Sequence, residues 1–287
     1  MNVDIAAAAQ LACLLEASAP KPGNVSPGRH FKDVRYEHFL ASAAAIGTPL
    51  AGAGGRPVGE TILLAAQATS RWTRSNTNLG IVLLLAPLAR AAAGTTELAE
   101  QPRPDELRDA LRQVLEGTTV DDARHVFAAI RLASPGGLGD TPEQDVADEP
   151  TVTLLEAMQM AADYDGIARE YSTGFATTFE VAVPALERAR TDGLSWDDGV
   201  VELFMTVLAA QPDTHIARRG GVELAADISQ RAADVMRAGG VRSEEGRRAL
   251  GYFDHSLRDP RNIGNPGTTA DLTAAAIFVA LLQGAWT

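Results

Sequence analysis

The chain has 287 residues, a net charge of −12 and 46% hydrophobic residues. This length and apolar share allow one large buried core, and no uninterrupted apolar stretch is long enough to cross a bilayer. The negative charge repels phosphate backbones at long range, which argues against duplex nucleic acid as a partner. The only cysteine, Cys13, excludes an internal disulfide and a thiolate metal cluster. We therefore expect a single soluble domain over residues 1–287, in the cytoplasm, without a secretory leader or membrane contact.

Hydrophobic residues recur at helical spacing along almost the whole chain. The stretches are 3–18, 36–47, 57–72, 79–93, 105–116, 121–133, 153–170, 174–190, 197–210, 222–238, 243–257 and 269–284. Because alternating strand patterns are absent from the sequence, we predict an all-α, multi-helix fold. Segment 269–284 is apolar around its whole circumference, which predicts a buried C-terminal helix at the centre of the core. Proline and glycine clusters predict loops at 20–30, 48–59, 101–104, 134–150 and 262–268.

The loop at 19–33 collects positive charge in a protein that is otherwise acidic. Lys21, Arg29, His30 and Lys32 lie in it among prolines and glycines, and Lys21 and Lys32 are the two lysines of the sequence. Clustered cations on a stiff loop are typical of an anion site. An ordinary connection between two helices is the alternative interpretation.

Three further loops precede or join predicted helices and carry polar side chains. Asn76 and Thr77 open the helix at 79–93, where free backbone amides can bind phosphate, although helix capping alone also explains them. In the segment 213–221, Asp213 is a candidate for holding a metal or orienting a base. Its two arginines, 218 and 219, are candidate phosphate ligands, with a bare helix end as the alternative. In the segment 265–272, Thr268 and Asp271 have the spacing of a capping box, so capping and metal binding both stay open.

Several familiar catalytic motifs are absent from the sequence. There is no phosphate-binding P-loop, no zinc-binding HExxH motif and no GxSxG nucleophile elbow, and the five histidines are scattered. The glycine-rich stretch Ser134–Asp140 does not follow a predicted strand, which excludes a dinucleotide-binding fingerprint.

In their order along the chain, the polar loops resemble the motifs of the triphosphoribosyl-dephospho-CoA synthase family. The resemblance runs over nearly the whole chain. The matching residues are Lys21-Pro22-Gly23-Asn24-Val25 with Gly28, His30 and Asp33; Asn76-Thr77 with Gly80; Glu170 with Gly174-Phe175-Ala176-Thr177; Pro184 with Leu186; Asp213-Thr214 with Arg219-Gly220-Gly221; and Pro266-Gly267 with Ala270-Asp271-Leu272.

The resemblance implies an ATP-dependent transferase of the triphosphoribosyl type that acts in coenzyme biosynthesis. In that family the 2′-hydroxyl of dephospho-CoA attacks C1 of the ATP ribose, adenine leaves, and the triphosphate stays attached to the ribose. The implied partners are a nucleotide and a small coenzyme precursor, with Mg²⁺ as the expected cofactor. Packing against a second copy of the chain stays open.

The resemblance also implies roles for individual residues. Carboxylates stabilise a ribose that develops positive charge and exchange protons with the hydroxyl and the adenine; the candidates are Asp33, Glu170, Asp213 and Asp271. We expect Asp33, Asp213 and Asp271 to face one pocket and to include the Mg²⁺ ligands. The candidate substrate-binding residues are Lys21, Gly23, Arg29, His30, Asn76, Thr77, Arg218, Arg219, Gly220, Thr268 and Thr269. Since polyphosphate needs a local positive pocket, we expect Lys21, His30 and Arg219 to lie close together.

One departure from the family pattern predicts a divergent branch. The family usually reads Asn-Thr-His-Lys-Gly where this chain has Asn78 and Leu79 in place of the histidine and lysine, so we expect one phosphate contact to be lost. The branch resembles homologues from archaea and from bacteria that use methanopterin-type one-carbon cofactors, which suggests a different acceptor. Two other functions stay open: a Mg²⁺-dependent nucleotide or N-glycoside hydrolase, and a non-catalytic nucleotide-binding protein.

Overall fold

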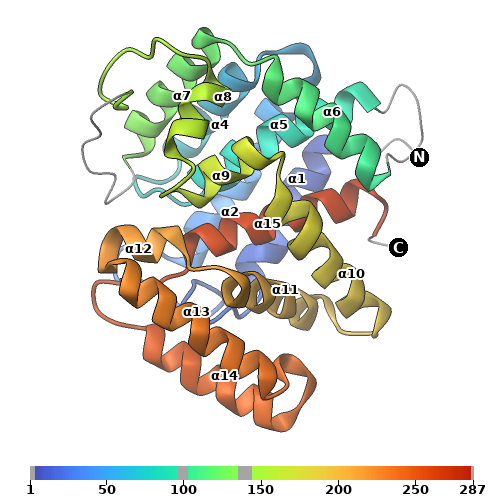
Figure 1. The fold of residues 1–287 in the computed structure, drawn as a ribbon, viewed down its shortest axis with the longest axis vertical. Coiled ribbons are helices and arrows are strands. Elements are labelled where there is room, and N and C mark those ends of the chain that lie inside the picture. The colour runs from blue at the N-terminus through green and yellow to red at the C-terminus, as the bar shows by residue number, and fades with distance from the viewer. Residues whose placement is uncertain (1–3, 96–102, 135–143, 286–287) are drawn as a thin grey trace.

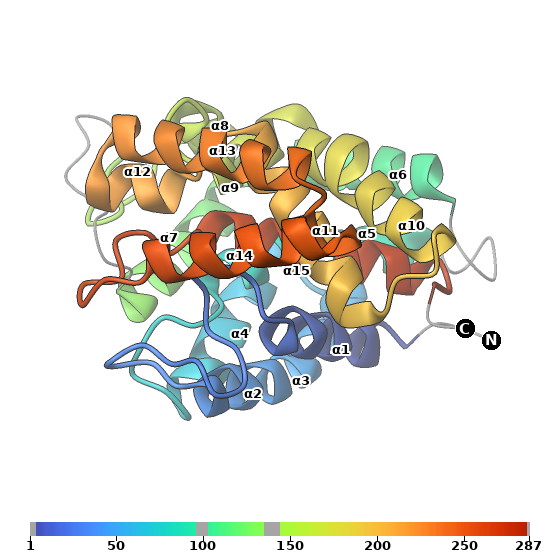
Figure 2. The same cartoon turned by 90° about the horizontal axis from the view of Figure 1, so that it is seen from below.

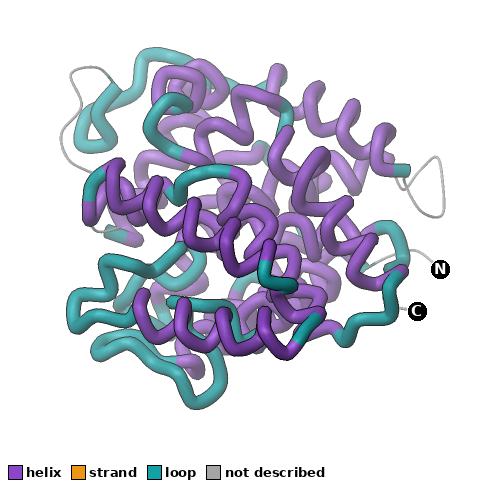
Figure 3. The backbone as a smooth tube through the Cα atoms, turned by 60° about the horizontal axis from the view of Figure 1, so that its bottom comes forward, coloured by secondary structure: helices purple, strands orange, loops and turns teal. Residues whose placement is uncertain are grey.

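Helices make up the regular structure of the described chain, as Figures 1 and 3 show. The structure is a computed structural model, and it describes residues 4–95, 103–134 and 144–285. Its α-helices are α1 Ile5–Ser18, α2 Tyr36–Ala45, α3 Gly47–Ala51, α4 Val58–Ser70, α5 Leu79–Thr95, α6 Pro104–Glu116, α7 Val120–Ala133, α8 Leu154–Ala161, α9 Gly166–Thr173, α10 Val183–Thr191, α11 Trp196–Ala210, α12 Thr214–Gly220, α13 Val222–Arg237, α14 Glu244–Leu257 and α15 Gly267–Leu282. Across these described ranges no strand forms, so the predicted all-α fold is confirmed.

Helix α15 lies at the centre of the molecule, with α1, α5 and α11 packed around it (Figures 1 and 2). All of its residues from Leu272 to Leu282 are buried. A helix that is apolar on every side gains most from burial when neighbours cover its whole circumference, which is why it occupies the middle of the core. The predicted buried C-terminal helix is therefore confirmed, and its first turn, at Gly267–Asp271, is brought into the interior.

Local capping explains where several helices begin. Thr119 and Asp122 form a reciprocal capping box at the start of α7, and Thr153 and Glu156 do the same for α8. Each box satisfies backbone amides that have no partner inside the helix. These caps determine the residues at which α7 and α8 begin. Both helices contribute to one wall of the cavity.

The structure differs from the predicted elements in three places. The stretch 153–170 is divided into α8 and α9, because Asp165 accepts hydrogen bonds from the amides of Ile167 and Ala168 and so starts a new helix. The predicted loop at 213–221 contains the short helix α12, and α3, which begins at Gly47, extends into the predicted loop at 48–59. Each is only one or two turns long, too short for hydrophobic periodicity to reveal.

The predicted loop at 101–104 and the glycine-rich Ser134–Asp140 lie largely outside the described residues, which omit 96–102 and 135–143. Within the described ranges, no helix combines the length and apolar character that a membrane span requires.

Candidate active site

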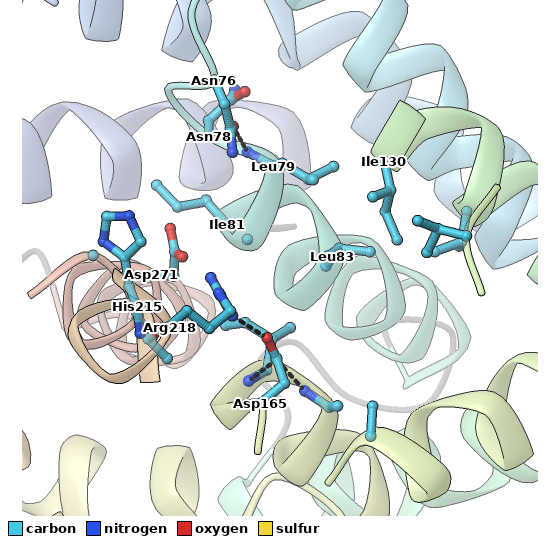
Figure 4. Close-up of a pocket in the computed structure, with 18 of the residues that line it drawn as sticks. Asn76, Asn78, Leu79, Ile81, Leu83, Ile130, Asp165, His215, Arg218 and Asp271 are labelled. Carbon is cyan, nitrogen blue, oxygen red and sulfur yellow. Dashed lines mark hydrogen bonds and ion pairs between the residues drawn. The ribbon is translucent and has the colours of Figure 1, made fainter. Parts of the chain in front are cut away.

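A cavity of about 500 Å³ opens where the starts of α5 and α15 meet α12 and the pair α8 and α9. Its volume lies within the range of about 300–1,000 Å³ that is usual for small-molecule sites. Figure 4 shows that its two ends differ: His215, Arg218 and Asp271 lie together at one end, while Leu83 and Ile130 lie at the other. The cavity therefore joins a charged end to an apolar end.

Asp271 presents its carboxylate to the charged end of this cavity (Figure 4). It stands in the first turn of α15 beside Gly80 of α5, and a Cβ atom at Gly80 would lie only 2.0 Å from the Asp271 Oδ2 atom. The glycine thus leaves the space that the carboxylate fills. Burial, followed by the negative charges of Glu16 and Asp213, raises the pKa of Asp271 well above its usual value. An acid in this setting keeps its proton at higher pH than an exposed aspartate does.

Glu16 brings a second carboxylate to the cavity from the last turns of α1. Its side chain is buried, and its Oε1 atom lies 3.0 Å from the Nζ atom of Lys21. Burial raises the pKa of Glu16, and the charge of Lys21 and its hydrogen bond oppose that rise. Glu16 and Asp271 therefore form an interacting pair of carboxylates in which only Glu16 has a lysine partner.

Two arginines of α12 line the same cavity. The Arg218 Nη1 atom lies 2.5 Å from the Asp165 Oδ2 atom, while its Nε atom is buried without a hydrogen-bond partner in the described structure. Arg219 lies nearer to solvent and donates to the backbone oxygens of Arg261 and Asn262. The cavity thus holds fixed positive charge close to its acidic pair, and the described residues supply no acceptor for the buried Nε–H of Arg218.

His215 and Asn265 complete the charged end. The His215 Nδ1 atom is 3.1 Å from the Asn265 backbone oxygen, and burial lowers the pKa of His215. Gly267 makes room for the imidazole, because a Cβ atom there would lie 2.4 Å from Nδ1. The side-chain Oδ1 atom of Asn265 is buried and has no partner in the described structure. Unpaired buried polar atoms are rare in proteins, so those on Arg218 and Asn265 indicate a polar ligand.

The start of α5 supplies the wall that faces these groups. Asn76 accepts a hydrogen bond from the Leu79 amide and caps the helix, whereas Thr77 hydrogen-bonds to Ser42 through its hydroxyl. Asn78 donates to the Thr69 hydroxyl and lines the cavity. This wall therefore presents an amide and the apolar Leu79 at the two positions where the sequence resemblance led us to compare them with a histidine and a lysine.

The apolar end is lined by aliphatic and aromatic side chains of α5, α7, α8 and α9. They include Leu83, Val126, Phe127, Ile130, Leu154, Met158 and Ile167. At the rim, Met160 and Tyr164 are partly exposed. This end can hold a flat ring or an aliphatic chain without hydrogen-bonding partners.

The loop at 19–33 is tied to α14 and contributes little to the cavity wall. The amide of Gly23 donates to Asp254, with which Arg29 also forms an ion pair. His30 accepts a hydrogen bond from the Tyr36 amide and is exposed, as is Asp33. Of Lys21, His30 and Arg219, only Arg219 lines the cavity, so the structure does not support a phosphate pocket shared by all three.

The predicted cluster of three aspartates is corrected by the structure. Asp213 lies outside the cavity lining, and both of its oxygens cap helices: Oδ1 accepts from the Ile216 amide, and Oδ2 accepts from the amide and hydroxyl of Thr269. Asp33 is exposed on its loop, so only Asp271 faces the cavity. The described residues contain no group of three or more His, Cys, Asp or Glu side chains arranged to hold a metal.

The other predicted residues divide in the same way. Glu170 is fully buried away from the cavity, where its carboxylate accepts hydrogen bonds from Thr177 and Thr178 and so connects α9 to the turn that follows. Gly220 ends α12 outside the lining. Thr268 does line the cavity, where its hydroxyl lies 3.0 Å from that of Thr214.

Several polar residues of the cavity were not predicted as site residues, among them Glu16, Asp165, His215 and Asn265 at or near its charged end. One signal for Glu16 exists in the sequence, since it is a single carboxylate on an otherwise apolar helix. The others reach the cavity only because α9, α12 and the loop before α15 come together in three dimensions.

Comparison with known proteins assigns the family. The model of the CitG family, described as ATP:dephospho-CoA triphosphoribosyl transferase, matches residues 2–287. The chain belongs to the CitG family. A crystal structure of an Archaeoglobus fulgidus protein, described as a candidate triphosphoribosyl-dephospho-CoA synthase, is 32% identical, with a TM-score of 0.65 over 85% of this chain and 99% of that one.

Curated relatives of this CitG-family chain match it over different shares of its length. A 2-(5''-triphosphoribosyl)-3'-dephosphocoenzyme-A synthase of Pectobacterium atrosepticum is 26% identical over 86% of this chain and 70% of that protein. A Pseudomonas syringae pv. tomato protein named "Probable 2-(5''-triphosphoribosyl)-3'-dephosphocoenzyme-A synthase" is 31% identical over 42% of this chain. That match spans 40% of the relative's own length. The predicted resemblance to this family is thereby confirmed.

Proposed function

We propose that this CitG-family protein transfers the triphosphoribosyl group of ATP to a hydroxyl group of a coenzyme precursor and releases adenine. The observation that carries the proposal is the pair of carboxylates, Glu16 and Asp271, in a cavity that also holds the guanidinium groups of Arg218 and Arg219. Glycosyl transfer needs this combination, because the ribose gains positive charge while two protons change place.

The two carboxylates suit opposite tasks in this reaction. Glu16, next to Lys21, is the better candidate for the ionised base that takes the proton of the acceptor hydroxyl. Burial is the largest of the causes that raise the pKa of Asp271 well above its usual value. Asp271 is therefore the better candidate for the acid that protonates the departing adenine. The bond from ribose C1 to the acceptor oxygen forms as the bond from C1 to adenine N9 breaks. After each turnover a proton returns from Glu16 to Asp271 through solvent.

The cations suit the triphosphate. The guanidinium groups of Arg218 and Arg219 line the cavity and can pair with phosphate oxygens. The aspartates predicted as Mg²⁺ ligands do not fit a protein-held ion, because Asp213 is used in caps and Asp33 lies outside the cavity. The protein therefore offers no site for a resident metal among these aspartates, and Mg²⁺ would enter bound to the nucleotide phosphates as part of the substrate.

The apolar end favours an acceptor, or a leaving base, with a flat or aliphatic portion. Leu83, Ile130 and Met158 offer contact area and no hydrogen-bond donors there. Dephospho-CoA and pterin-like precursors both have such portions as well as a hydroxyl, so the proposal covers this class of acceptor.

Product analysis by mass spectrometry tests the function. Purified protein is incubated with MgATP alone, and then with MgATP and each of a panel of hydroxylated coenzyme precursors. Transfer predicts free adenine only when an acceptor is present, with an acceptor product that is heavier by one triphosphoribosyl group. Free adenine and ribose triphosphate from ATP alone would instead identify a hydrolase. Nucleotide binding without any product across the panel would identify a binding protein.

A further inference from the structure

The side chain of Lys21 is fully buried and does not line the cavity, although its loop was expected to bind phosphate. Helix α1 ends at Ser18, and the chain turns back at once through Pro22 and Gly23. The turn is held by the bond from the Gly23 amide to Asp254. This path places the Lys21 ammonium group against the last turns of α1.

All three N–H donors of the ammonium group have partners within the protein. The Nζ atom lies 3.0 Å from the Glu16 carboxylate, and it donates to the backbone oxygen of Glu16 and, at 3.3 Å, to that of Ala19. A lysine ammonium has only three N–H groups, so Lys21 has no donor left for a phosphate. Of its partners in the described structure, Glu16 is the one that also lines the cavity, so Lys21 can act on the cavity through Glu16.

We propose that Lys21 is a positioning residue, which fixes Glu16 as the ionised member of the Glu16–Asp271 carboxylate pair. This inference rests on the proposed function, because it assigns Glu16 the role of base in that reaction. It also explains why a buried lysine stands in a loop that resembles a substrate-binding motif. Lys21 acts on a carboxylate of the site and does not touch the substrate.

The charged and titratable groups around the pair make it asymmetric. Glu16 faces Lys21, with Asp271 as a negative neighbour and the Cys13 thiol on its own helix. Asp271 experiences the negative charges of Glu16, Asp213 and Asp165, and the opposing charge of Arg218. A lysine at salt-bridge distance favours the charged form of Glu16, whereas the balance at Asp271 favours the protonated form.

The substitution Lys21→Met tests this inference, with Lys32→Met as the matched control. Lys32 is the only other lysine, and it is exposed on the same loop. Without the Lys21 cation, Glu16 should stay protonated to higher pH. The acid limb of the pH profile of kcat should therefore move up by at least about one pH unit, which equals a tenfold loss of rate at a fixed pH on that limb. Lys32→Met should leave the profile unchanged. An unmoved acid limb in Lys21→Met would overturn the inference.

A second readout does not depend on turnover. The carboxyl carbon of Glu16, labelled with ¹³C and assigned with the variant Glu16→Gln, reports its own titration by NMR. Its midpoint should rise in Lys21→Met even if no acceptor for the transferase is ever found, so the failure of the proposed function can be told from the failure of this inference. An unchanged midpoint contradicts the role of Lys21 directly.

The double variant Glu16→Gln/Lys21→Met covers the case in which Lys21→Met does not fold. It leaves neither a carboxylate nor an ammonium group unpaired in the interior. Such an unpaired charge is the main cost of breaking a buried ion pair. If Lys21 acts only through Glu16, the double variant should bind MgATP as tightly as Glu16→Gln alone. A further tenfold loss of MgATP affinity in the double variant would mean that Lys21 binds phosphate itself, and would overturn the inference.

Discussion

Gly80→Ala should strongly reduce activity while preserving the fold. In the structure the added Cβ atom would lie 2.0 Å from the Oδ2 atom and 2.5 Å from the Cγ atom of Asp271. An ordinary carbon–oxygen contact is about 3.3 Å, so the Asp271 carboxylate would have to move by about 1.3 Å. Misplacing a reacting group by about 1 Å can cost a factor of ~10² in rate. We therefore expect kcat to fall about 100-fold.

The stability of the Gly80→Ala variant should change little. Alanine favours helix over glycine by up to ~1 kcal/mol, which offsets part of the strain against one short side chain. Gly94→Ala is the matched control, since Gly94 lies in the same helix, α5, with no neighbouring atom within 4 Å of an added Cβ. Adenine release in the presence of acceptor measures the rate, and thermal denaturation measures the fold.

Two results would refute this reasoning. A Gly80→Ala enzyme with kcat within about twofold of the wild type would show that the position of Asp271 does not matter for the reaction. A large fall in melting temperature, with none in Gly94→Ala, would show that α5 moves as a whole instead of the carboxylate.

Three further substitutions separate functional from structural polar groups. Since the folded protein raises the pKa of Asp271, its contribution to stability is complete below about pH 4 and is lost as the pH rises through the folded-state value. The melting temperature of Asp271→Asn, measured by fluorimetry over a pH series, should therefore exceed that of the wild type at pH 8. The difference should close towards pH 4, and a lower melting temperature at every pH would contradict this. Asp213→Asn should lower the free energy of unfolding, measured by urea denaturation, by about 2–4 kcal/mol, because the one oxygen of an amide cannot accept from both the Ile216 and the Thr269 amides. Unchanged stability would contradict the capping role of Asp213. Arg218→Met should weaken MgATP binding about 10- to 100-fold in calorimetry, as expected for a charge-assisted hydrogen bond, and unaltered affinity would place the phosphates elsewhere.

The helices could be predicted from the sequence because their packing follows a local rule. Segment 269–284 has no polar face, so its central position follows from the need to cover it on all sides. The break at Asp165 could not be predicted in the same way, because the apolar pattern continues through it and only the cap made by this side chain separates α8 from α9. A very short helix is also hard to predict from hydrophobic periodicity, and α12 has only 7 residues.

The site was predictable in its motifs but not in the roles of its residues. Asp271 and Arg218 were expected to face the nucleotide, and both line the cavity. Asp213 was expected to join them, but a carboxylate at a helix start can either cap or face a ligand, and the sequence does not show which amides lie near. Lys21 shows the same limit. A lysine beside prolines and glycines is typical of a phosphate loop, and only the fold reveals the buried Glu16 that it contacts instead.

Two labels on ATP, followed through one turnover, test the proposed transfer most directly. ATP that carries ¹⁴C in the adenine ring and ³²P in the γ-phosphate is incubated with the protein and an acceptor from the panel. Triphosphoribosyl transfer predicts that the ¹⁴C appears as free adenine while an equal amount of ³²P moves to the acceptor. Recovery of the ³²P as inorganic phosphate, or of both labels together on one product, would contradict triphosphoribosyl transfer.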